Sequence, residues 1–552
     1  MQPTRTTLSH TALVRIVSYK YSRSGTPPHR EAIKALTQAR NRGITSLLEE
    51  QRNVWQDRWR HADIEISGDP DMTRSIRFAM FHLASTVASS GEAAVGARGL
   101  SGPAYSGHVF WDSDVFVLPM LAATNPRSAR AMLEYRLRRL DAAREAVSKS
   151  GRSGLRFPWE SAHEGIDVTP QSGMDEHGNV VPILTGKMEE HISADVAWAA
   201  WQLASWTGRW QFLRGAGMPL VVETARYWAS RVERDGDSNY HISHIIGPDE
   251  YHEDVDDNAY TNIMAAWNLR RGAELLARLY HLDLVGQPPY LQSDVYQSPE
   301  KQGSSHSNNR LLEDAQNSAL QEAGSWIEIA NSLVDGYDPL TGMYEQFAGY
   351  NRLEPLTVSD IGEPPFAADL ILGRERLQGS QIIKQADVMM AYLLVPEELH
   401  SESLPDNLDF YLKRTAHGSS LSPGVHAALL AQVGRVDEAV DMLRLACAID
   451  IDDLTGTVGG GLHIANFGAI WQAVVKGFAG IKVTRPDYGI LRLNPRIPDN
   501  WGTLTINMLW HGKPVRLLCH TDGVEIFCSS PLRVQLFDNA PVSLEPPGGR
   551  LK

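Results

Sequence analysis

The sequence predicts a mainly α-helical protein, with many helices of similar length that suit a helical toroid, followed by a small antiparallel β-domain. Between about residues 70 and 482, apolar residues recur with the period of a helix, and no segment alternates clearly as a strand does. After about residue 483 the period changes to two, with Gly-containing turns between short apolar runs. The chain has 552 residues, 43% of them hydrophobic and 21% charged, so it can bury a sizeable core.

The first part of the chain divides into two short regions. Residues 1–24 contain one β-rich segment, Ala12–Ser18, and a lone strand cannot form a domain. Residues 25–69 are charged, have a helical period and are expected to form a linker. The apolar residues of this linker fall roughly on one face: Ile33, Leu36, Ile44, Leu47 and Leu48.

The central region, residues 70–482, is expected to be a helical domain. Its segment Ala194–Trp206 is apolar nearly all round, which indicates a helix buried between neighbours. Residues 285–309 are rich in Pro, Ser, Gln and Asn and are expected to form an exposed excursion. The predicted helices are Thr73–Ser89, Arg127–Lys149, Ala194–Trp206, Val221–Val232, Ala259–Tyr280, Gln385–Val395, Gly424–Val433, Val436–Ala448 and Ile464–Val475.

Residues 483–552 are expected to form the β-domain, because short runs alternate between apolar and polar residues with HGK and TDG turns between them. The predicted strands are Tyr488–Leu493, Thr503–Trp510, Pro514–His520, Gly523–Cys528 and Leu532–Phe537.

Charge and cysteine content restrict the function classes. The formal net charge is −14, which argues against a nucleic-acid partner, since such proteins present a basic face. It favours a neutral or cationic small ligand, although a local positive pocket can hold an anion. The three cysteines show no CxxC spacing, no apolar run is long enough for a membrane span, and the first residues lack the apolar core of a secretory signal. We therefore expect a cytoplasmic protein without disulfides or membrane association.

A first candidate for chemistry is the acidic segment GPDEYH, residues 247–252. Gly247 and Pro248 fix a turn, so Glu250 is presented from a loop. Partial desolvation of a carboxylic acid raises its pKa enough for it to donate a proton near neutrality. The alternatives are a loop that caps a helix and a calcium site, although the calcium spacing DxDxDG is absent.

A second candidate is the segment Thr415–Ser422, which contains His417, Ser419 and Ser420 ahead of a predicted helix. Hydroxyl groups and backbone N–H groups at a helix N-terminus form a natural anion-binding site. Ordinary N-capping by Ser422 before Pro423 explains the same residues equally well. A serine nucleophile is disfavoured because no GxSxG motif is present.

Other polar clusters are weaker candidates. Trp111 with Asp112, Lys384 with Gln385, and the run 189–191 (Glu-Glu-His) combine polar groups with tryptophan or precede a buried helix. Aromatic faces beside polar groups suit sugars, but each cluster alone is more typical of a solvated loop. Most of the 14 tryptophans are expected to fill the core. The histidines fall at no metal-binding spacing, so we expect no metal.

Taken together and in this order, these segments resemble glycoside hydrolase family 65, which includes maltose, trehalose and kojibiose phosphorylases and related hydrolases. The matching blocks span about residues 100 to 482, and the combination is highly specific although each block alone is not. The blocks are GHVFWDSDVF, RFPWESAHEG, EEHISADVAWA, IIGPDEYHEDVDDNAYTN, EQFAGY, IKQADVMM, TAHGSSLS and GLHIANFGAIWQAVVKGFAGI.

The resemblance implies an (α/α)6 barrel at residues 70–482 and specific roles for eight residues. Glu250 matches the general acid. Trp111, Asp112, Lys384 and Gln385 match the glucose subsite, and His417, Ser419 and Ser420 match the phosphate-binding segment. The implied partners are a small disaccharide and inorganic phosphate as co-substrate, with no other cofactor.

Three functions remain open on this basis. Phosphate is itself an anionic nucleophile, so the expected activity is inverting phosphorolysis of a maltose-, trehalose- or kojibiose-type disaccharide to β-glucose 1-phosphate. A hydrolase would need a second carboxylate about 6.5–9.5 Å from the acid to activate water, for which Glu160, Glu190 and Asp387 are candidates. An inactive carbohydrate-binding remnant is the third possibility.

The resemblance also implies a large β-sandwich ahead of the barrel, of which residues 1–24 are expected to be a remnant. In the family that domain helps to form a dimer and closes over the active site. A homodimer is therefore left open, and the expected shortening at the front would expose apolar surface.

Overall fold

The computed structural model describes residues 13–20, 27–87, 90–174, 178–280, 306–483 and 489–552. The chain divides into two compact units, residues 1–62 and residues 63–552. Along the parts that the structure describes, no helix is long and apolar enough to cross a lipid bilayer.

In its described part, residues 13–20 and 27–62, the first unit contains two helices, α1 (Pro28–Arg42) and α2 (Ile44–Arg60). They are joined at Gly43, whose φ of 79° allows the sharp change of direction. Neither helix buries a residue. The predicted strand Ala12–Ser18 is not formed, because residues 13–20 have no partner strand and remain irregular; Ala12 lies outside the described residues.

The helical linker expected at residues 25–69 ends earlier than predicted. Residues Ile64–Ile66 form strand β1 instead of helix. Ile64 and Ile66 are buried while Glu65 is exposed, so these residues alternate as a strand does and pair with the C-terminal strand β9 (Leu504–Trp510).

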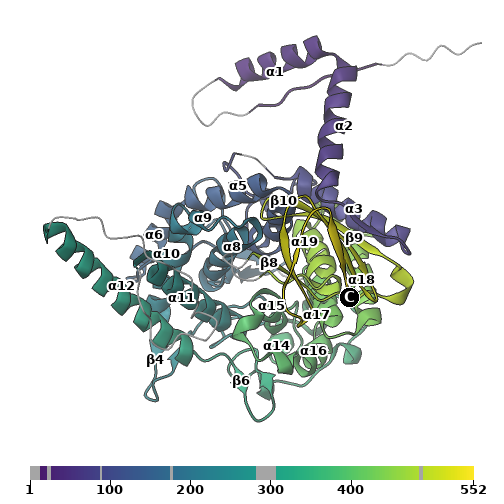
Figure 1. Ribbon diagram of the computed structural model, residues 1–552. Coiled ribbons are helices and arrows are strands. Elements are labelled where there is room, and N and C mark those ends of the chain that lie inside the picture. The colour runs from purple at the N-terminus through teal and green to yellow at the C-terminus, as the bar shows by residue number, and fades with distance from the viewer. Residues whose placement is uncertain (1–12, 21–26, 88–89, 175–177, 281–305, 484–488) are drawn as a thin grey trace, which may run out of the picture. The chain divides into compact units, whose positions relative to one another are not determined.

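The second unit is built on an (α/α)6 barrel (Figure 1). Within the described residues, six helices contact one another in a closed inner ring, and six more pack outside it. The inner helices are α4 (Leu118–Thr124), α8 (Ile192–Thr207), α11 (Ala259–Tyr280), α15 (Val388–Leu394), α17 (Ser422–Gln432) and α19 (Ile464–Gln472). The outer helices are α3 (Pro70–Ser85), α5 (Pro126–Leu137), α10 (Met218–Arg231), α12 (His306–Ser332), α16 (Leu404–Leu412) and α18 (Val436–Ile451).

Burial explains why the inner helices lack a polar face. Every residue of α8, α15 and α19 is buried, as neighbours on all sides require. The prediction that Ala194–Trp206 is enclosed is therefore confirmed. Two inner helices are joined to π-helical turns, Ser113–Val117 before α4 and Ala473–Phe478 after α19.

The predicted helix Arg127–Lys149 is broken in the structure into α5 and α6 (Leu140–Lys149). Arg139 leaves helical geometry at φ −118° and ψ 16°. Its guanidinium stacks on the Tyr135 ring at 3.7 Å and donates to the carbonyl of Ala162 at 3.2 Å, which fixes the turn. Most of the predicted excursion, residues 285–305, lies outside the described residues, and helix α12 begins at His306.

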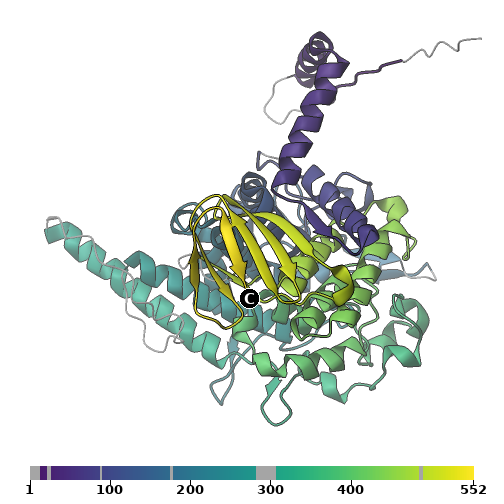
Figure 2. The same cartoon turned by 45° about the vertical axis from the view of Figure 1, so that its right-hand side comes forward.

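The C-terminal strands form two sheets, in which all five predicted strands are confirmed (Figure 2). A five-stranded antiparallel sheet has the order β1-β9-β10-β11-β14, and a three-stranded sheet has the order β13-β12-β8, in which β12 and β8 are parallel. The remaining bounds are β8 (Ile490–Leu493), β10 (Lys513–His520), β11 (Gly523–Cys528), β12 (Leu532–Leu536), β13 (Val542–Leu544) and β14 (Gly548–Leu551). The ring of Trp510 in β9 contacts that of Trp206 in α8 at 5.7 Å and so attaches the first sheet to the barrel.

Candidate active site

A cavity of about 760 Å³ is lined by segments that each lead into an inner helix. Residues 105–112 precede α4, 181–185 precede α8, 384–385 precede α15 and 418–421 precede α17. Four of the inner helices, α4, α8, α15 and α17, therefore follow closely on segments that line this cavity.

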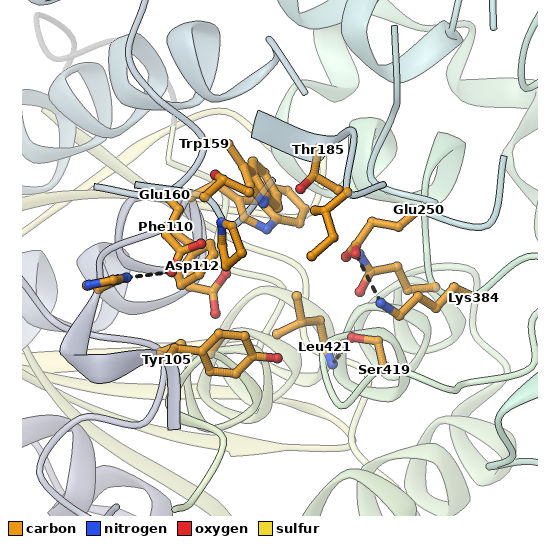
Figure 3. A pocket seen from close by; sticks show the side chains of 18 of the residues that line it. Tyr105, Phe110, Asp112, Trp159, Glu160, Thr185, Glu250, Lys384, Ser419 and Leu421 are labelled. Carbon is orange, nitrogen blue, oxygen red and sulfur yellow. Dashed lines mark hydrogen bonds and ion pairs between the residues drawn. The ribbon is translucent and has the colours of Figure 1, made fainter. Parts of the chain in front are cut away.

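Glu250 and Lys384 form an ion pair on the cavity wall, with 3.2 Å between Nζ and Oε2 (Figure 3). Burial alone would lower the pKa of Lys384, but the adjacent Glu250 carboxylate outweighs it and the pKa is raised. The Glu250 side chain is 31% exposed. The carboxyl group expected to be partly desolvated is thus only half-buried, and a cation faces it.

Trp111 and Asp112 form another part of the wall, beside Trp159. The Trp111 ring is buried and contacts the rings of Trp159 at 6.4 Å and His191 at 4.9 Å, which fixes its plane. Burial raises the pKa of Asp112 to about 7, and the negative charge of Glu250 adds to this effect. In Figure 3, Asp112 and Trp159 lie across the cavity from Glu250 and Lys384.

Ser419 and Ser420 line the same cavity, together with the backbone of Gly418. His417 does not line it: its side chain is buried, and its ring contacts that of His426 edge-on at 5.0 Å. Burial holds the pKa of His417 well below its usual range, so the imidazole is neutral. The structure thus brings two of the three predicted phosphate-binding side chains to the cavity wall.

The alternative explanation of this segment, N-capping by Ser422, is wrong. Helix α17 begins at Ser422 and has no side-chain cap. The Ser422 hydroxyl instead accepts a hydrogen bond from the backbone N–H of Ala386 at 3.1 Å, which joins the segment to the residues after Gln385.

Of the three candidate bases, only Glu160 lines the cavity. Its carboxylate accepts a hydrogen bond from His108 Nδ1 at 2.5 Å, and burial raises its pKa. Glu190 is buried and accepts from Tyr227 Oη at 2.7 Å and Arg231 Nε at 2.6 Å. Asp387 is buried and accepts from Asn258, so neither it nor Glu190 reaches the cavity.

The Glu-Glu-His cluster at 189–191 is not a sugar-contacting group, because none of its side chains lines the cavity. His191 lies behind Trp111 and bonds Asp195 at 2.7 Å. Burial opposes the charge on His191, but the Asp195 carboxylate prevails and raises the pKa of His191 to about 9. His191 alone of the three packs against the aromatic wall, since its ring contacts those of Trp111 at 4.9 Å and Trp159 at 5.5 Å.

Sequence reasoning missed Tyr105 and Arg98, which also line the cavity. Tyr105 and Ser106 have φ values of 58° and 52°, and Gly107 follows at 76°, so three consecutive residues adopt left-handed backbone. Only Gly107 gave any sign of this in the sequence. Arg98 donates to the carbonyl of Gly461 at 2.7 Å, a contact between residues 363 positions apart that no local pattern predicts. Among the described residues, no cluster of side chains is suited to hold a metal ion.

Two curated proteins are similar to this chain over most of its length. A kojibiose phosphorylase of Caldanaerobacter subterraneus subsp. tengcongensis is 35% identical over 496 residues, covering 88% of this chain and 60% of that protein. An alpha,alpha-trehalose phosphorylase of Thermoanaerobacter brockii is 30% identical over 512 residues, covering 92% of this chain and 61% of that protein. The chain thus spans about 60% of the length of these curated relatives.

The fold has a counterpart among solved structures. A human-microbiome protein with the provisional name kojibiose phosphorylase superposes with a TM-score of 0.78 at 22% identity, covering 95% of this chain and 71% of that chain. The model of the glycosyl hydrolase family 65 C-terminal domain matches residues 484–540. The model of the family's central catalytic domain matches residues 77–472, most of the chain, and the protein therefore belongs to glycosyl hydrolase family 65.

Proposed function

We propose that this protein catalyses the inverting phosphorolysis of an α-linked glucose disaccharide of the maltose, trehalose or kojibiose type. The products are β-glucose 1-phosphate and a free sugar. The observation that carries the proposal is the joint placement of Glu250, Lys384, Ser419 and Ser420 on one cavity. Relatives that bear the names kojibiose phosphorylase and trehalose phosphorylase support it.

The proposed reaction exchanges one bond at C1 of the glucose. Glu250 gives its proton to the glycosidic oxygen as the C1–O bond breaks. A phosphate oxygen attacks C1 from the opposite face and forms the new bond, so the configuration inverts. Ser419, Ser420 and the backbone at the N-terminus of α17 would hold the phosphate, and Trp111, Asp112, Lys384 and Gln385 the glucose. His417 would act from behind the wall, as a neutral ring under the phosphate-binding segment.

Hydrolysis is the second candidate, and the position of Glu160 favours it. Glu160 is the one candidate base on the cavity wall, and His108 orients its carboxylate. In that reaction Glu160 would remove a proton from water, which would attack C1 in place of phosphate.

The deciding experiment measures glucose release from a panel of α-linked glucobioses, with and without millimolar phosphate, together with assay of β-glucose 1-phosphate. Phosphate-dependent β-glucose 1-phosphate is the expected result. Glucose release that is independent of phosphate would identify a hydrolase. Sugar binding without turnover in either condition would identify an inactive remnant.

The phosphate site gives a separate prediction. The Ser419→Ala variant is expected to raise the KM for phosphate about 10-fold, since a hydrogen bond to a charged group contributes roughly 1.5–3 kcal/mol. The KM for the disaccharide serves as the internal control and is expected to change little. Initial rates at varied phosphate and fixed sugar measure the effect, and an unchanged phosphate KM would remove Ser419 from the site.

We also propose a cytoplasmic location, no cofactor besides the phosphate co-substrate and no nucleic-acid partner. The buried, unpaired thiols of Cys447, Cys519 and Cys528 support a reducing compartment. The net charge of −14 supports small-molecule partners. Gel filtration of the protein would test whether it forms the homodimer left open above.

A further inference from the structure

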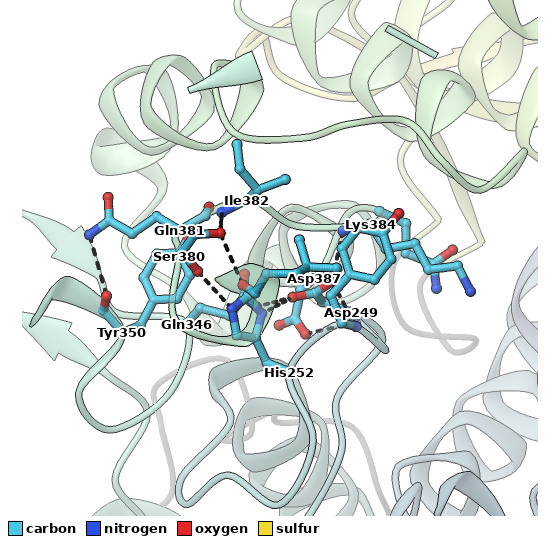
Figure 4. Close-up of polar contacts among 12 residues, drawn as sticks. Asp249, His252, Gln346, Tyr350, Ser380, Gln381, Ile382, Lys384 and Asp387 are labelled. Carbon is cyan, nitrogen blue, oxygen red and sulfur yellow. Dashed lines mark hydrogen bonds and ion pairs between the residues drawn. The ribbon is translucent and has the colours of Figure 1, made fainter. Parts of the chain in front are cut away.

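Two segments of the chain bring the Glu250–Lys384 pair together. The acid loop, residues 246–252, carries Glu250, and the lysine segment, residues 380–387, carries Lys384. More than 120 residues of sequence separate the two segments, so only tertiary contacts fix the position of one against the other. Figure 4 shows that these contacts converge on Asp249, the residue before Glu250.

The two segments are joined by reciprocal hydrogen bonds. The Asp249 carboxylate accepts from the backbone N–H of Lys384 at 2.8 Å. In return, the backbone N–H of Asp249 donates to Asp387 Oδ2 at 3.2 Å. A third bond runs from Gln385 Nε2 to the carbonyl of Pro248 at 2.5 Å. Asp249, the residue before Glu250, is therefore bonded directly to the main chain of Lys384, the ion-pair partner of Glu250.

Asp249 is itself fixed from two further directions. Its Oδ2 accepts from His252 Nδ1 at 2.6 Å and from Gln346 Nε2 at 2.9 Å. The other ring nitrogen of His252 donates to the carbonyl of Ser380 at 2.8 Å, so the imidazole also connects the acid loop to the lysine segment. Burial opposes the charge on His252, but the Asp249 carboxylate outweighs it and raises the pKa of His252.

The space around these bonds allows little adjustment. Asp249 is 1% exposed, and a Cβ atom added to Gly247 would lie 2.5 Å from Asp387 Oδ2 and 2.3 Å from Asn258 Nδ2. A buried carboxylate with several donors is costly to disturb, because any donor left without an acceptor keeps its desolvation penalty.

We propose that Asp249 is a positioning residue for catalysis. Its carboxylate accepts a hydrogen bond from the backbone N–H of Lys384, and because Asp249 directly precedes Glu250 in the chain, this bond fixes Glu250 and Lys384 relative to each other. This inference rests on the general-acid role proposed for Glu250. Asp249 does not line the cavity, so it acts through Glu250 and not by contact with the sugar.

The leaving group of the substrate separates this role from a structural one. A disaccharide needs protonation of its leaving oxygen, whereas α-glucosyl fluoride releases fluoride without help from an acid. In the fluoride reaction phosphate attacks C1, the C1–F bond breaks with its electron pair leaving on fluoride, and no proton from Glu250 is needed.

The test compares kcat of the Asp249→Asn variant on the disaccharide that the panel identifies and on α-glucosyl fluoride, both with phosphate. We expect kcat on the disaccharide to fall by about 10² because a misplaced reacting group costs on that order. We expect kcat on the fluoride to fall at least about tenfold less, because a displaced Lys384 would affect the glucose of both substrates alike, whereas lost proton transfer from Glu250 affects only the disaccharide. Equal losses on both substrates would overturn the proposal.

Asp257 provides a matched control. It is a buried aspartate in the same part of the chain and also accepts from a histidine, a backbone N–H and a side-chain amide: His241 at 2.7 Å, Ile242 at 3.1 Å and Asn262 at 3.1 Å. None of these partners lines the cavity. The Asp257→Asn variant is expected to lower stability without discriminating between the two substrates. Discrimination equal to that of Asp249→Asn would count against a specific role of Asp249.

Two further variants keep the test decisive. If Asp249→Asn does not fold, Gln346→Met removes one donor to Asp249 and is expected to give the same preference for the fluoride; no preference would overturn the proposal.

Glu250→Gln tests the general-acid role on which the proposal rests. If it lowers activity on both substrates equally, the acid role fails and the positioning role with it. If only Glu250→Gln discriminates, the positioning role alone fails.

Discussion

The Glu250→Gln variant is expected to lose about 10²- to 10⁴-fold in kcat on an unactivated disaccharide, the usual contribution of a positioned general acid. Glutamine keeps the size of the side chain but has no proton to give to the leaving oxygen. In the unmodified protein Lys384 Nζ lies 3.2 Å from Glu250 Oε2. In the variant the charged lysine can still donate a hydrogen bond to the amide oxygen, although the ion pair is lost. Initial rates with saturating phosphate measure the loss.

Two controls accompany this variant. Turnover of α-glucosyl fluoride is expected to survive, because that substrate needs no proton from the enzyme. The KM for the disaccharide is expected to change much less than kcat, since the lost interaction develops as the bond breaks. A disaccharide kcat within threefold of the unmodified protein would remove Glu250 from the reaction.

The Arg136→Met variant is expected to lose about 3–5 kcal/mol of unfolding free energy, the typical cost of leaving a buried charge without its partner. Arg136 in α5 donates to Asp114 Oδ2 at 2.6 Å, and the side chains are 2% and 3% exposed. Arg136 also donates to the carbonyl of Phe110 at 3.2 Å, directly before Trp111 and Asp112. Denaturant unfolding monitored by tryptophan fluorescence would measure the loss.

The loss in Arg136→Met is expected to depend on pH. Burial raises the pKa of Asp114 in the folded protein, and the charge of Arg136 only partly opposes it. Without Arg136 the folded state binds the Asp114 proton more tightly than the unfolded state does. Stability is therefore regained as the pH falls below that raised pKa, and the full loss is present above it.

A double variant tests the cause. Arg136→Met with Asp114→Leu removes both charges and is expected to recover much of the stability, since well-packed apolar residues often replace a buried pair without cost. A double variant as unstable as the single one would show that the loss does not come from the unpaired Asp114 charge but from the other contacts of Arg136, such as its hydrogen bond to the carbonyl of Phe110 at 3.2 Å.

Local sequence patterns were sufficient for much of the fold. The period of 3.6 located α8 and α11 to within two residues, and the period of two located the five strands. The break at Arg139 was not predictable, because it depends on contacts with Tyr135 and Ala162 that the helical pattern does not reveal. The pairing of β1 with β9 joins residues more than 430 positions apart, and three alternating residues are too few to predict it.

The site shows the same division. Glu250, Lys384 and Ser419 stand in motifs whose residue types already suggest their chemistry, and all three line the cavity. Whether Glu190 and His417 reach the cavity depends on neighbours from other segments. Arg231 donates a hydrogen bond to Glu190, which lies outside the cavity, and the ring of His426 packs against the ring of His417 behind the cavity wall. A carboxylate or an imidazole in the sequence carries no sign of which side it will face.

Most of the cavity wall comes from connections outside the inner helices, so the residues that line the cavity are largely separate from those that hold the ring together. The ring holds together through helix-to-helix burial, and the connections contribute side chains to the cavity without crossing the ring. One connection can therefore be exchanged or lengthened while its two anchoring helices stay unchanged, since longer loops add little to the cost of closure. The strands β2 (Ser172–Met174) and β3 (Val180–Pro182) pair antiparallel, and β3 contributes Val181 and Pro182 to the cavity wall. This part of the wall is the natural first piece to exchange between relatives in order to test how the acceptor sugar of the proposed reaction is chosen.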